Sequence, residues 1–203
     1  MLAETLRRRQ LEFEKYNHAY LDLNYRMGAR RKEIACELLN RFRSAGQDQS
    51  FLDVGAGRGE MIAFAKKIGF QDAQGTEVVP RLCAGSVFYS PAHNLAVDDN
   101  EFDVVACLDV LEHLLAEDIP QVLVELVRVS SAALIISTSS NESRMIGPGG
   151  TIANLHITIR TGDQWGALIE SIADFFLVDP SVVKRSENGT HYWSITWKGK
   201  KAC

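Results

Sequence analysis

Short apolar runs alternate with amphipathic segments along most of the chain. Strands are predicted at "FLDV" (51–54), "AQGTEVV" (73–79), "SVFYS" (86–90), "EFDVVACLD" (101–109) and "AALIISTS" (132–139). Helices are predicted between them, at 60–70 and at 116–129, where Pro120 falls in the first turn. Strands that alternate with helices are typical of a mostly parallel sheet with helices on both faces.

The two ends of the chain depart from this alternation. Residues 1–45 are predicted to be helical, because apolar residues from Ile34 to Phe42 recur at helical spacing. Residues 140–158 are predicted to form a long glycine-containing loop, and a helix is expected at 161–173. Strands at 175–185 and 190–199 flank Asn188-Gly189, which is a strong hairpin signal.

These elements predict an α/β fold, a Rossmann-like three-layer α/β/α sandwich. Its sheet would have seven strands, mostly parallel, with one antiparallel strand from the C-terminal hairpin. We expect one domain over residues 1–203, with residues 1–45 as a helical lid that contacts substrate and residues 46–203 as a cofactor-binding core. No internal repeat or low-complexity linker divides it.

Composition is that of an ordinary globular chain, with 46% hydrophobic and 24% charged residues among 203. The four cysteines (Cys36, Cys83, Cys107 and Cys203) have neither metal-ligand nor redox spacing, so no metal site is predicted. The N-terminal residues lack the apolar segment of a secretory signal, and no apolar run approaches the length of a membrane span. These features predict a reduced, cytoplasmic protein with no membrane association.

Charge is unevenly distributed, although the net charge is only -4. Residues 1–43 contain ten basic and six acidic residues, and residues 183–203 contain five basic residues and one acidic residue. Solvated helix faces explain such a pattern. A second interpretation is that the two basic ends converge beside the site and attract an anionic substrate.

Acidic residues and glycines gather where predicted strands end. Asp53, Glu77 and Asp109 end three different strands, and "DVGAGRG" places glycines at alternate positions after Asp53. Ligands of parallel sheets bind at this edge. Glycines let the backbone approach a ligand closely, and a carboxylate beside them suits an ammonium group and opposes a pyrophosphate.

The segment "DVGAGRG" resembles the first motif of class I S-adenosylmethionine-dependent methyltransferases. The segment "FDVVACLDVLEHL" (102–114) resembles the fourth-strand motif of the same superfamily, closest to the branch that methylates small molecules. The resemblance covers roughly residues 48–183, and the hairpin at 175–199 is similar to the family's final strand pair.

The resemblance implies S-adenosylmethionine as cofactor and assigns residues to its parts. Asp53 would accept hydrogen bonds from the amino group, and Glu77 from both ribose hydroxyls. Backbone groups of the glycine turn would approach the cofactor, namely Gly55, Ala56, Gly57 and Gly59. Val78 would lie against adenine, Leu108 and Asp109 near the methionine part, and Arg26 would pair with the methionine carboxylate.

One position departs from the family pattern. Many relatives place an acid after the third strand to meet the adenine amino group, whereas Ser90 or Pro91 falls near that place here. Adenine recognition would then use backbone groups around Ala92 and His93. An acid at the offset of Glu77 also occurs in nicotinamide-binding folds, so Glu77 alone does not discriminate between the two cofactors.

Methyl transfer from a sulfonium is an in-line displacement, in which the protein aligns the nucleophile and excludes water. A general base is needed only for a nucleophile that is protonated at the working pH. His113, after the fourth strand, and His156, after the long loop, are the candidate catalytic residues, with Glu112, Tyr20 and Tyr25 nearby in the predicted fold. The alternative is a purely structural role, in which these side chains are held by backbone hydrogen bonds or packed in the core.

Several acceptors are compatible with the sequence. "DVLE" (109–112) lacks the Pro-Pro-aromatic run of exocyclic-amine methyltransferases and the Pro-Cys pair of cytosine C5 enzymes. A small-molecule acceptor is expected, with unknown oligomeric state. The alternatives are a nucleotide, nucleic acid or protein acceptor, which the basic ends alone support, a cofactor-binding but inactive partner subunit, and a nicotinamide oxidoreductase.

Overall fold

A computed structural model describes residues 2–196 except 24, 45, 147–151 and 172–180. Its central sheet has seven strands in the order β3-β2-β1-β4-β5-β9-β8. The strands are β1 (Ser50–Val54), β2 (Asp72–Glu77), β3 (Val87–Tyr89), β4 (Phe102–Leu108), β5 (Ser130–Ser139), β8 (Ser181–Glu187) and β9 (Thr190–Thr196). Only β9 runs against its neighbours, as the hairpin predicted, so the expected sheet is confirmed.

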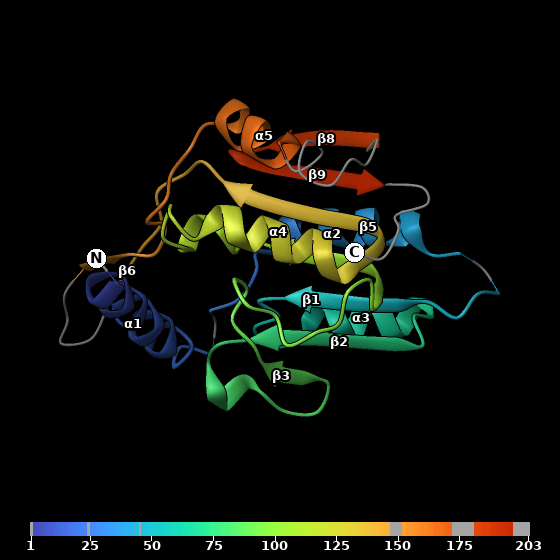
Figure 1. Ribbon diagram of the computed structural model, residues 1–203, viewed down its shortest axis with the longest axis horizontal. Helices are drawn as coiled ribbons and strands as arrows, with labels where there is room; N and C mark the ends of the chain where they lie inside the picture. Colours follow the sequence, from blue (N-terminus) through green and yellow to red (C-terminus); the bar gives the residue numbers. More distant parts are fainter. Residues whose placement is uncertain (1, 24, 45, 147–151, 172–180, 197–203) are drawn as a thin grey trace.

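Helices cover both faces of the sheet, which gives the expected three layers (Figure 1). The helices are α1 (Leu2–Ala19), α2 (Ala29–Phe42), α3 (Glu60–Ile68), α4 (Ile119–Val129) and α5 (Gly162–Glu170), with short 3-10 helices η1 (Pro80–Leu82) and η2 (Leu111–His113). Among the described residues, no helix combines the length and hydropathy that crossing a membrane requires.

Alternation along the strands divides the core between the two faces. Leu52, Val105 and Leu134 pack with α4 and α5, including the fully buried Trp165. Phe51, Val104 and Ile135 point to the other face and pack with α2 and α3. Trp165 and Trp193 are therefore core residues.

Two sequence predictions need correction. The segment 140–158 is more than a loop, because β6 (Arg144–Ile146) and β7 (Ile152–Asn154) pair as an antiparallel hairpin. The segment predicted to be helical at 1–45 contains two helices, because α1 ends at Ala19 and α2 begins at Ala29. Of the strand predicted at 175–185, only Ser181 onward belongs to β8 in the described structure, and residues 175–180 lie outside it.

Helix α1 lies apart from the three layers, at the end to which the arrows of β1, β2 and β5 point (Figure 1). An ion pair and a hydrogen bond attach it there: Arg9 pairs with Asp118 at the start of α4, with Nε 2.9 Å from Oδ2, and Lys15 donates to the Asn154 carbonyl at 2.7 Å. Helix α1 thus covers the edge of the sheet where Rossmann-like folds bind ligands.

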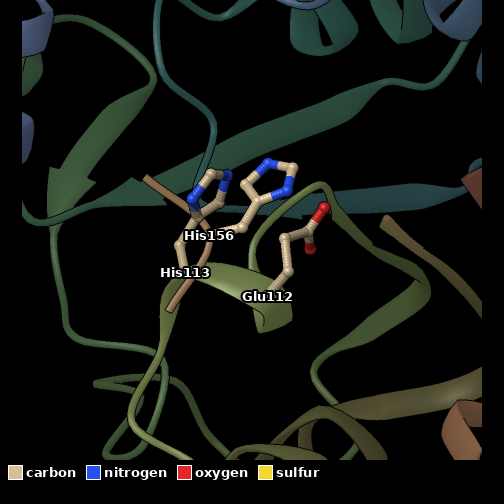
Figure 2. Close-up of side chains that lie close together, drawn as sticks. All are labelled: Glu112, His113 and His156. Atoms are coloured by element: carbon tan, nitrogen blue, oxygen red, sulfur yellow. The ribbon is translucent and has the colours of Figure 1, made fainter. Parts of the chain in front are cut away.

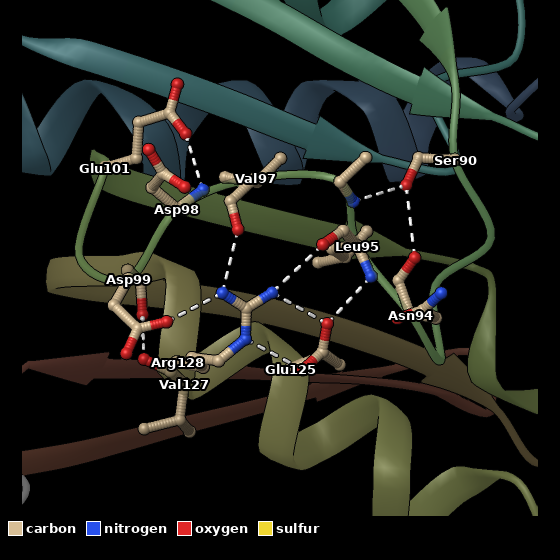
Figure 3. Close-up of polar contacts among 12 residues, drawn as sticks. Ser90, Asn94, Leu95, Val97, Asp98, Asp99, Glu101, Glu125, Val127 and Arg128 are labelled. Atoms are coloured by element: carbon tan, nitrogen blue, oxygen red, sulfur yellow. Dashed lines mark hydrogen bonds and ion pairs between the residues drawn. The ribbon is translucent and has the colours of Figure 1, made fainter. Parts of the chain in front are cut away.

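Arg128 fastens the loop after β3 to α4 (Figure 3). Its guanidinium donates to the carbonyls of Leu95 and Val97 at 3.0 and 2.8 Å, and to both carboxylate oxygens of Glu125 at 2.8 Å. A fifth bond, also 2.8 Å, reaches Asp99. All five guanidinium donors are therefore used, and the loop that begins at Ser90 is held against the helix.

We expect Arg128→Lys to lower the free energy of unfolding by about 2 kcal/mol, because lysine keeps the charge but cannot form the planar fork. Urea denaturation measures the loss. Arg144→Lys is the matched control, since the pair of Arg144 with Glu142 is exposed and its loss should cost less than about 0.5 kcal/mol. Equal losses in the two variants would contradict a structural role for the fork.

Candidate functional site

Three neighbouring strands end in acids at the same edge of the sheet. Asp53 lies near the end of β1, Glu77 ends β2, and Asp109 follows β4. Parallel pairing of β1 with both β2 and β4 sets their carboxyl ends side by side. The acids that the sequence distributed over 57 positions therefore face one site.

Two adjoining cavities, of about 230 and 370 Å³, open at this edge. They share Tyr20, Tyr25, Gly55, Asp109 and His113. The smaller cavity is lined further by Arg26, Arg31, Asp53, Ala56, Gly57, Leu108 and His156, and the larger one by Tyr16, Glu77, Val78, Ser90, Pro91, Ala92, His93 and Val110. Every predicted cofactor residue except Gly59 thus lines one of the two cavities.

The glycine turn is built so that only glycine fits its first two positions. Gly55 and Gly57 have φ of +79° and +53°, in the left-handed region that side chains disfavour. A Cβ at Gly55 would lie 2.5 Å from Cγ2 of Val110, and one at Gly57 would lie 2.6 Å from the Tyr20 hydroxyl. Gly59 instead begins α3 as its N-cap residue and lines neither cavity.

Asp53 is a buried acid without a side-chain partner among the described residues. Only 4% of its surface is exposed, and that surface faces the smaller cavity. Burial, with the nearby charge of Glu77, raises the pKa of Asp53 to about 7. An ammonium group in the cavity would supply the missing partner and restore the ionised form.

The Glu77 carboxylate accepts hydrogen bonds from three backbone amides. Its Oε2 accepts from the Gly57 backbone amide at 2.9 Å, and its Oε1 accepts from the amides of Val78 and Val79 at 2.7 and 3.1 Å. A carboxylate has about four acceptor positions, so one further hydroxyl can be accommodated beside these three bonds. Glu77 therefore holds the glycine turn at Gly57 and also lines the larger cavity, together with Val78.

Asp109 is neutralised by a residue that the sequence analysis did not select. Arg31, in α2, places its Nη1 3.0 Å from Oδ2 of Asp109, and the Ser137 hydroxyl donates to Oδ1 at 3.1 Å. Asp109 itself has φ of +53°, which turns the chain into the site. No spacing rule links positions 31 and 109, so only the fold could reveal this pair. Leu108 beside it is buried.

Arg26 lines the smaller cavity with no carboxylate partner in the described part of the chain. Its Nη2 donates to the Leu23 carbonyl at 3.5 Å. Arg58, in the glycine turn, donates to the carbonyls of Tyr20 and Asp22 at 3.2 and 3.1 Å. Its guanidinium also lies over the Tyr20 ring. Tyr20 and Asp22 are thereby held beside the glycine turn.

Basic residues near the two ends of the chain, which the second interpretation placed beside the site, are paired with acidic residues. Arg30 pairs with Glu187, and Arg185 pairs with Glu37 and Glu187, so these cations of α2 and β8 are already partnered on the surface. The lysines at 198, 200 and 201 lie outside the described residues. The described structure therefore offers no support for an extended anion-binding face at these two elements.

His113 and His156 come together although 43 positions separate them. Their ring centroids are 4.7 Å apart, and both side chains line the smaller cavity. Burial lowers the pKa of His113 to about 3, and it also lowers the pKa of His156, so both rings are neutral. Tyr16, which sequence reasoning missed, contacts Nδ1 of His113 through its hydroxyl.

Solved structures share this fold at low sequence identity. A protein from Pyrococcus horikoshii OT3 is 14% identical, with 87% of this chain and 94% of that one covered and a TM-score of 0.63. A 1,6-didemethyltoxoflavin-N1-methyltransferase from Burkholderia thailandensis, solved with S-adenosylhomocysteine, is 17% identical over 97% and 88%, with a TM-score of 0.57. The amino pentose methyltransferase CalS10 from Micromonospora echinaspora, with bound S-adenosylmethionine, is 15% identical over 89% and 95%, with a TM-score of 0.56.

A family model described as a methyltransferase domain matches residues 27–176, which is well over half of the chain. No curated protein matches the sequence. The matched residues include both motifs, the glycine turn and the two histidines of the site. The chain belongs to this methyltransferase family, within the class I superfamily that uses S-adenosylmethionine, which confirms the resemblance carried by "DVGAGRG" and "FDVVACLDVLEHL".

Proposed function

We propose that this methyltransferase transfers the methyl group of S-adenosylmethionine to a small molecule held beside the cofactor, in the part of the smaller cavity that His113 and His156 line. The observation that carries the proposal is the cavity itself, which is about 230 Å³ and is also lined by Tyr20 and Tyr25. Sites for small molecules are concave and largely enclosed, with a few polar groups that set orientation. The two methyltransferases named above act on a small heterocycle and an amino sugar, which supports the same class of acceptor.

The residues present fit the cofactor. Asp53 would bind its ammonium group and Arg26 its carboxylate, because each lines the cavity and pairs with no opposite charge among the residues that the structure describes. Glu77 and Val78 would hold the ribose and adenine in the larger cavity, beside Ala92 and His93. The bound cofactor supplies an already activated methyl group.

The chain's own residues align the acceptor and exclude water. The lid, residues 1–45, covers the strand ends through Tyr20 and Tyr25, whose rings pack edge to face with centroids 4.9 Å apart. His113 and His156 line the same cavity, where they would contact the acceptor as the catalytic residues of this proposal. Alignment and a dry cavity are the main contributions a protein makes to such a displacement.

Radiolabelled S-adenosylmethionine tests the acceptor class. The protein is incubated with a cell extract that is then separated by ultrafiltration, and we expect transferred label in the filtrate at a rate that changes little with salt. Label in retained RNA, DNA or protein, with a rate that falls steeply as salt rises, would contradict the proposal. Label in neither fraction would favour an inactive cofactor-binding subunit.

A further inference from the structure

We propose that Glu112, His113 and His156 form a binding site for one divalent transition-metal ion beside the acceptor cavity. Figure 2 shows the His156 ring between the His113 ring and the Glu112 carboxylate. One potential ligand atom from each residue lies within 4.8 Å of the others. Ligands about 2.1 Å from one tetrahedral ion are about 3.4 Å apart, so side-chain shifts of about 1 Å would complete the site.

The backbone fixes the two segments that carry these ligands. Glu112 and His113 belong to η2, directly after β4, whereas His156 follows β7. The Glu112 carbonyl accepts from the amides of Ile157 and Thr158, both at 3.0 Å. The Thr158 hydroxyl donates to the Leu114 carbonyl at 2.7 Å. The residues are therefore held together by the fold before any ion binds.

Both imidazoles are oriented as metal-binding histidines are. Nδ1 of His113 lies 3.0 Å from the Leu155 carbonyl, and Nδ1 of His156 lies 2.5 Å from the Asn141 carbonyl. A carbonyl only accepts, and the Tyr16 hydroxyl that contacts Nδ1 of His113 donates its own proton to the same Leu155 carbonyl at 3.1 Å. Each Nδ1 therefore carries the proton, and each Nε2 keeps its lone pair. Outer hydrogen bonds of this kind fix the tautomer and ring orientation of metal ligands.

Glu112 supplies an unpaired buried acceptor. Its Oε1 accepts from the Ser139 amide at 2.8 Å, whereas Oε2 is buried with no hydrogen-bond partner in the described structure. The residue is fully buried, and buried polar atoms are nearly always partnered. A cation at this place would satisfy Oε2.

The ligand set favours a first-row transition metal. Two imidazole nitrogens and one carboxylate oxygen suit Zn²⁺, Fe²⁺, Co²⁺ or Mn²⁺, whereas Mg²⁺ and Ca²⁺ prefer oxygen ligands alone. Three protein ligands leave positions open, and His113 and His156 both line the acceptor cavity. An acceptor oxygen can therefore reach the ion.

A consequence, which rests on the proposed function, is that the acceptor is a hydroxyl-bearing small molecule. A cation lowers the pKa of a hydroxyl that binds it, so the hydroxyl proton passes to water. The oxygen then forms its bond to the methyl carbon as the carbon–sulfur bond breaks, and that electron pair returns to sulfur. The charge of the sulfonium is neutralised in the same step.

Cobalt titration of the metal-free protein tests the site directly. We expect one Co²⁺ per chain, with a visible absorption band that Zn²⁺ abolishes by competition. Glu112→Gln and His156→Gln should each weaken binding by more than about 100-fold, the upper range even for outer-sphere substitutions. His93→Gln is the matched control and should bind Co²⁺ as the wild type does, because His93 lines the larger cavity away from the cluster.

Absence of a Co²⁺ band in the wild type, or unchanged affinity in both ligand variants, would overturn the metal site. Circular dichroism checks that each variant folds, and two variants guard against misfolding of Glu112→Gln. Titration with S-adenosylhomocysteine in parallel separates the two proposals. A wild-type protein that binds Co²⁺ but not S-adenosylhomocysteine would refute the proposed cofactor site and leave the metal site standing.

Discussion

Asp53→Asn should stabilise the ligand-free protein above pH 7 and abolish its binding of S-adenosylhomocysteine. The pKa of Asp53 is about 7 in the folded chain, against an ordinary value of 3.8 for an aspartate side chain. Between these values the unfolded state loses the proton that the folded state keeps. Stability contributed by the protonated group is therefore complete below about pH 4, is lost as pH rises through 7, and stays lost above it.

The cost above pH 7 is up to about 4 kcal/mol, since each pKa unit corresponds to about 1.4 kcal/mol. Asparagine has nearly the same shape without the charge, so the variant should melt at a higher temperature than the wild type at pH 8 and at nearly the same temperature at pH 4. Differential scanning calorimetry at both values measures this. Asp48→Asn, an exposed position, is the control and should change neither melting temperature.

Asp53→Asn should weaken cofactor binding, although it stabilises the protein without cofactor. Asparagine has no charge for the ammonium group, so isothermal titration at pH 8 should show at least about 100-fold weaker binding. In the wild type, affinity should fall about tenfold for each pH unit below 7, because Asp53 must first lose its proton. Retained binding in Asp53→Asn would show that the carboxylate does not hold the cofactor. Equal melting shifts at both pH values would contradict the raised pKa of Asp53.

Glu77→Ala should destabilise the protein and abolish cofactor binding together. The substitution leaves the backbone amides of Gly57, Val78 and Val79 without their acceptor at a position that is 5% exposed. Unpaired buried donors cost about 1–3 kcal/mol each, and water admitted by the smaller side chain recovers part of this, so we expect a loss of about 3 kcal/mol. Urea denaturation and calorimetric titration measure the two effects.

The two acids differ in their expected effect on stability, because Asp53→Asn should raise it and Glu77→Ala should lower it. Glu77→Gln is the matched variant, because its carbonyl oxygen can keep the bonds to Val78 and Val79 while its amide group opposes the Gly57 amide. We expect it to lie between the wild type and Glu77→Ala in stability. A stable Glu77→Ala protein that still binds S-adenosylhomocysteine would mean that the glycine turn is held by other contacts.

The sequence alone was sufficient for the fold because its signals are local. Alternating apolar runs and helical periods depend on residues close in the chain, and Asn188-Gly189 specifies its hairpin by backbone conformation alone. The same holds for the cofactor motif, whose acid and glycines lie within seven residues of one another. By contrast, the hairpin of β6 and β7 was missed, since its strands have three residues each and carry little periodic pattern.

The sequence by itself therefore determined the order of elements, the methyltransferase motifs and the acids at the strand ends. Only the tertiary structure decided which distant side chains meet. Arg31 reaches Asp109, Tyr16 reaches His113, and His156 joins Glu112 and His113 because η2 is bonded to the segment after β7. Such pairings depend on how packed elements are placed in space, and no spacing along the chain records that placement.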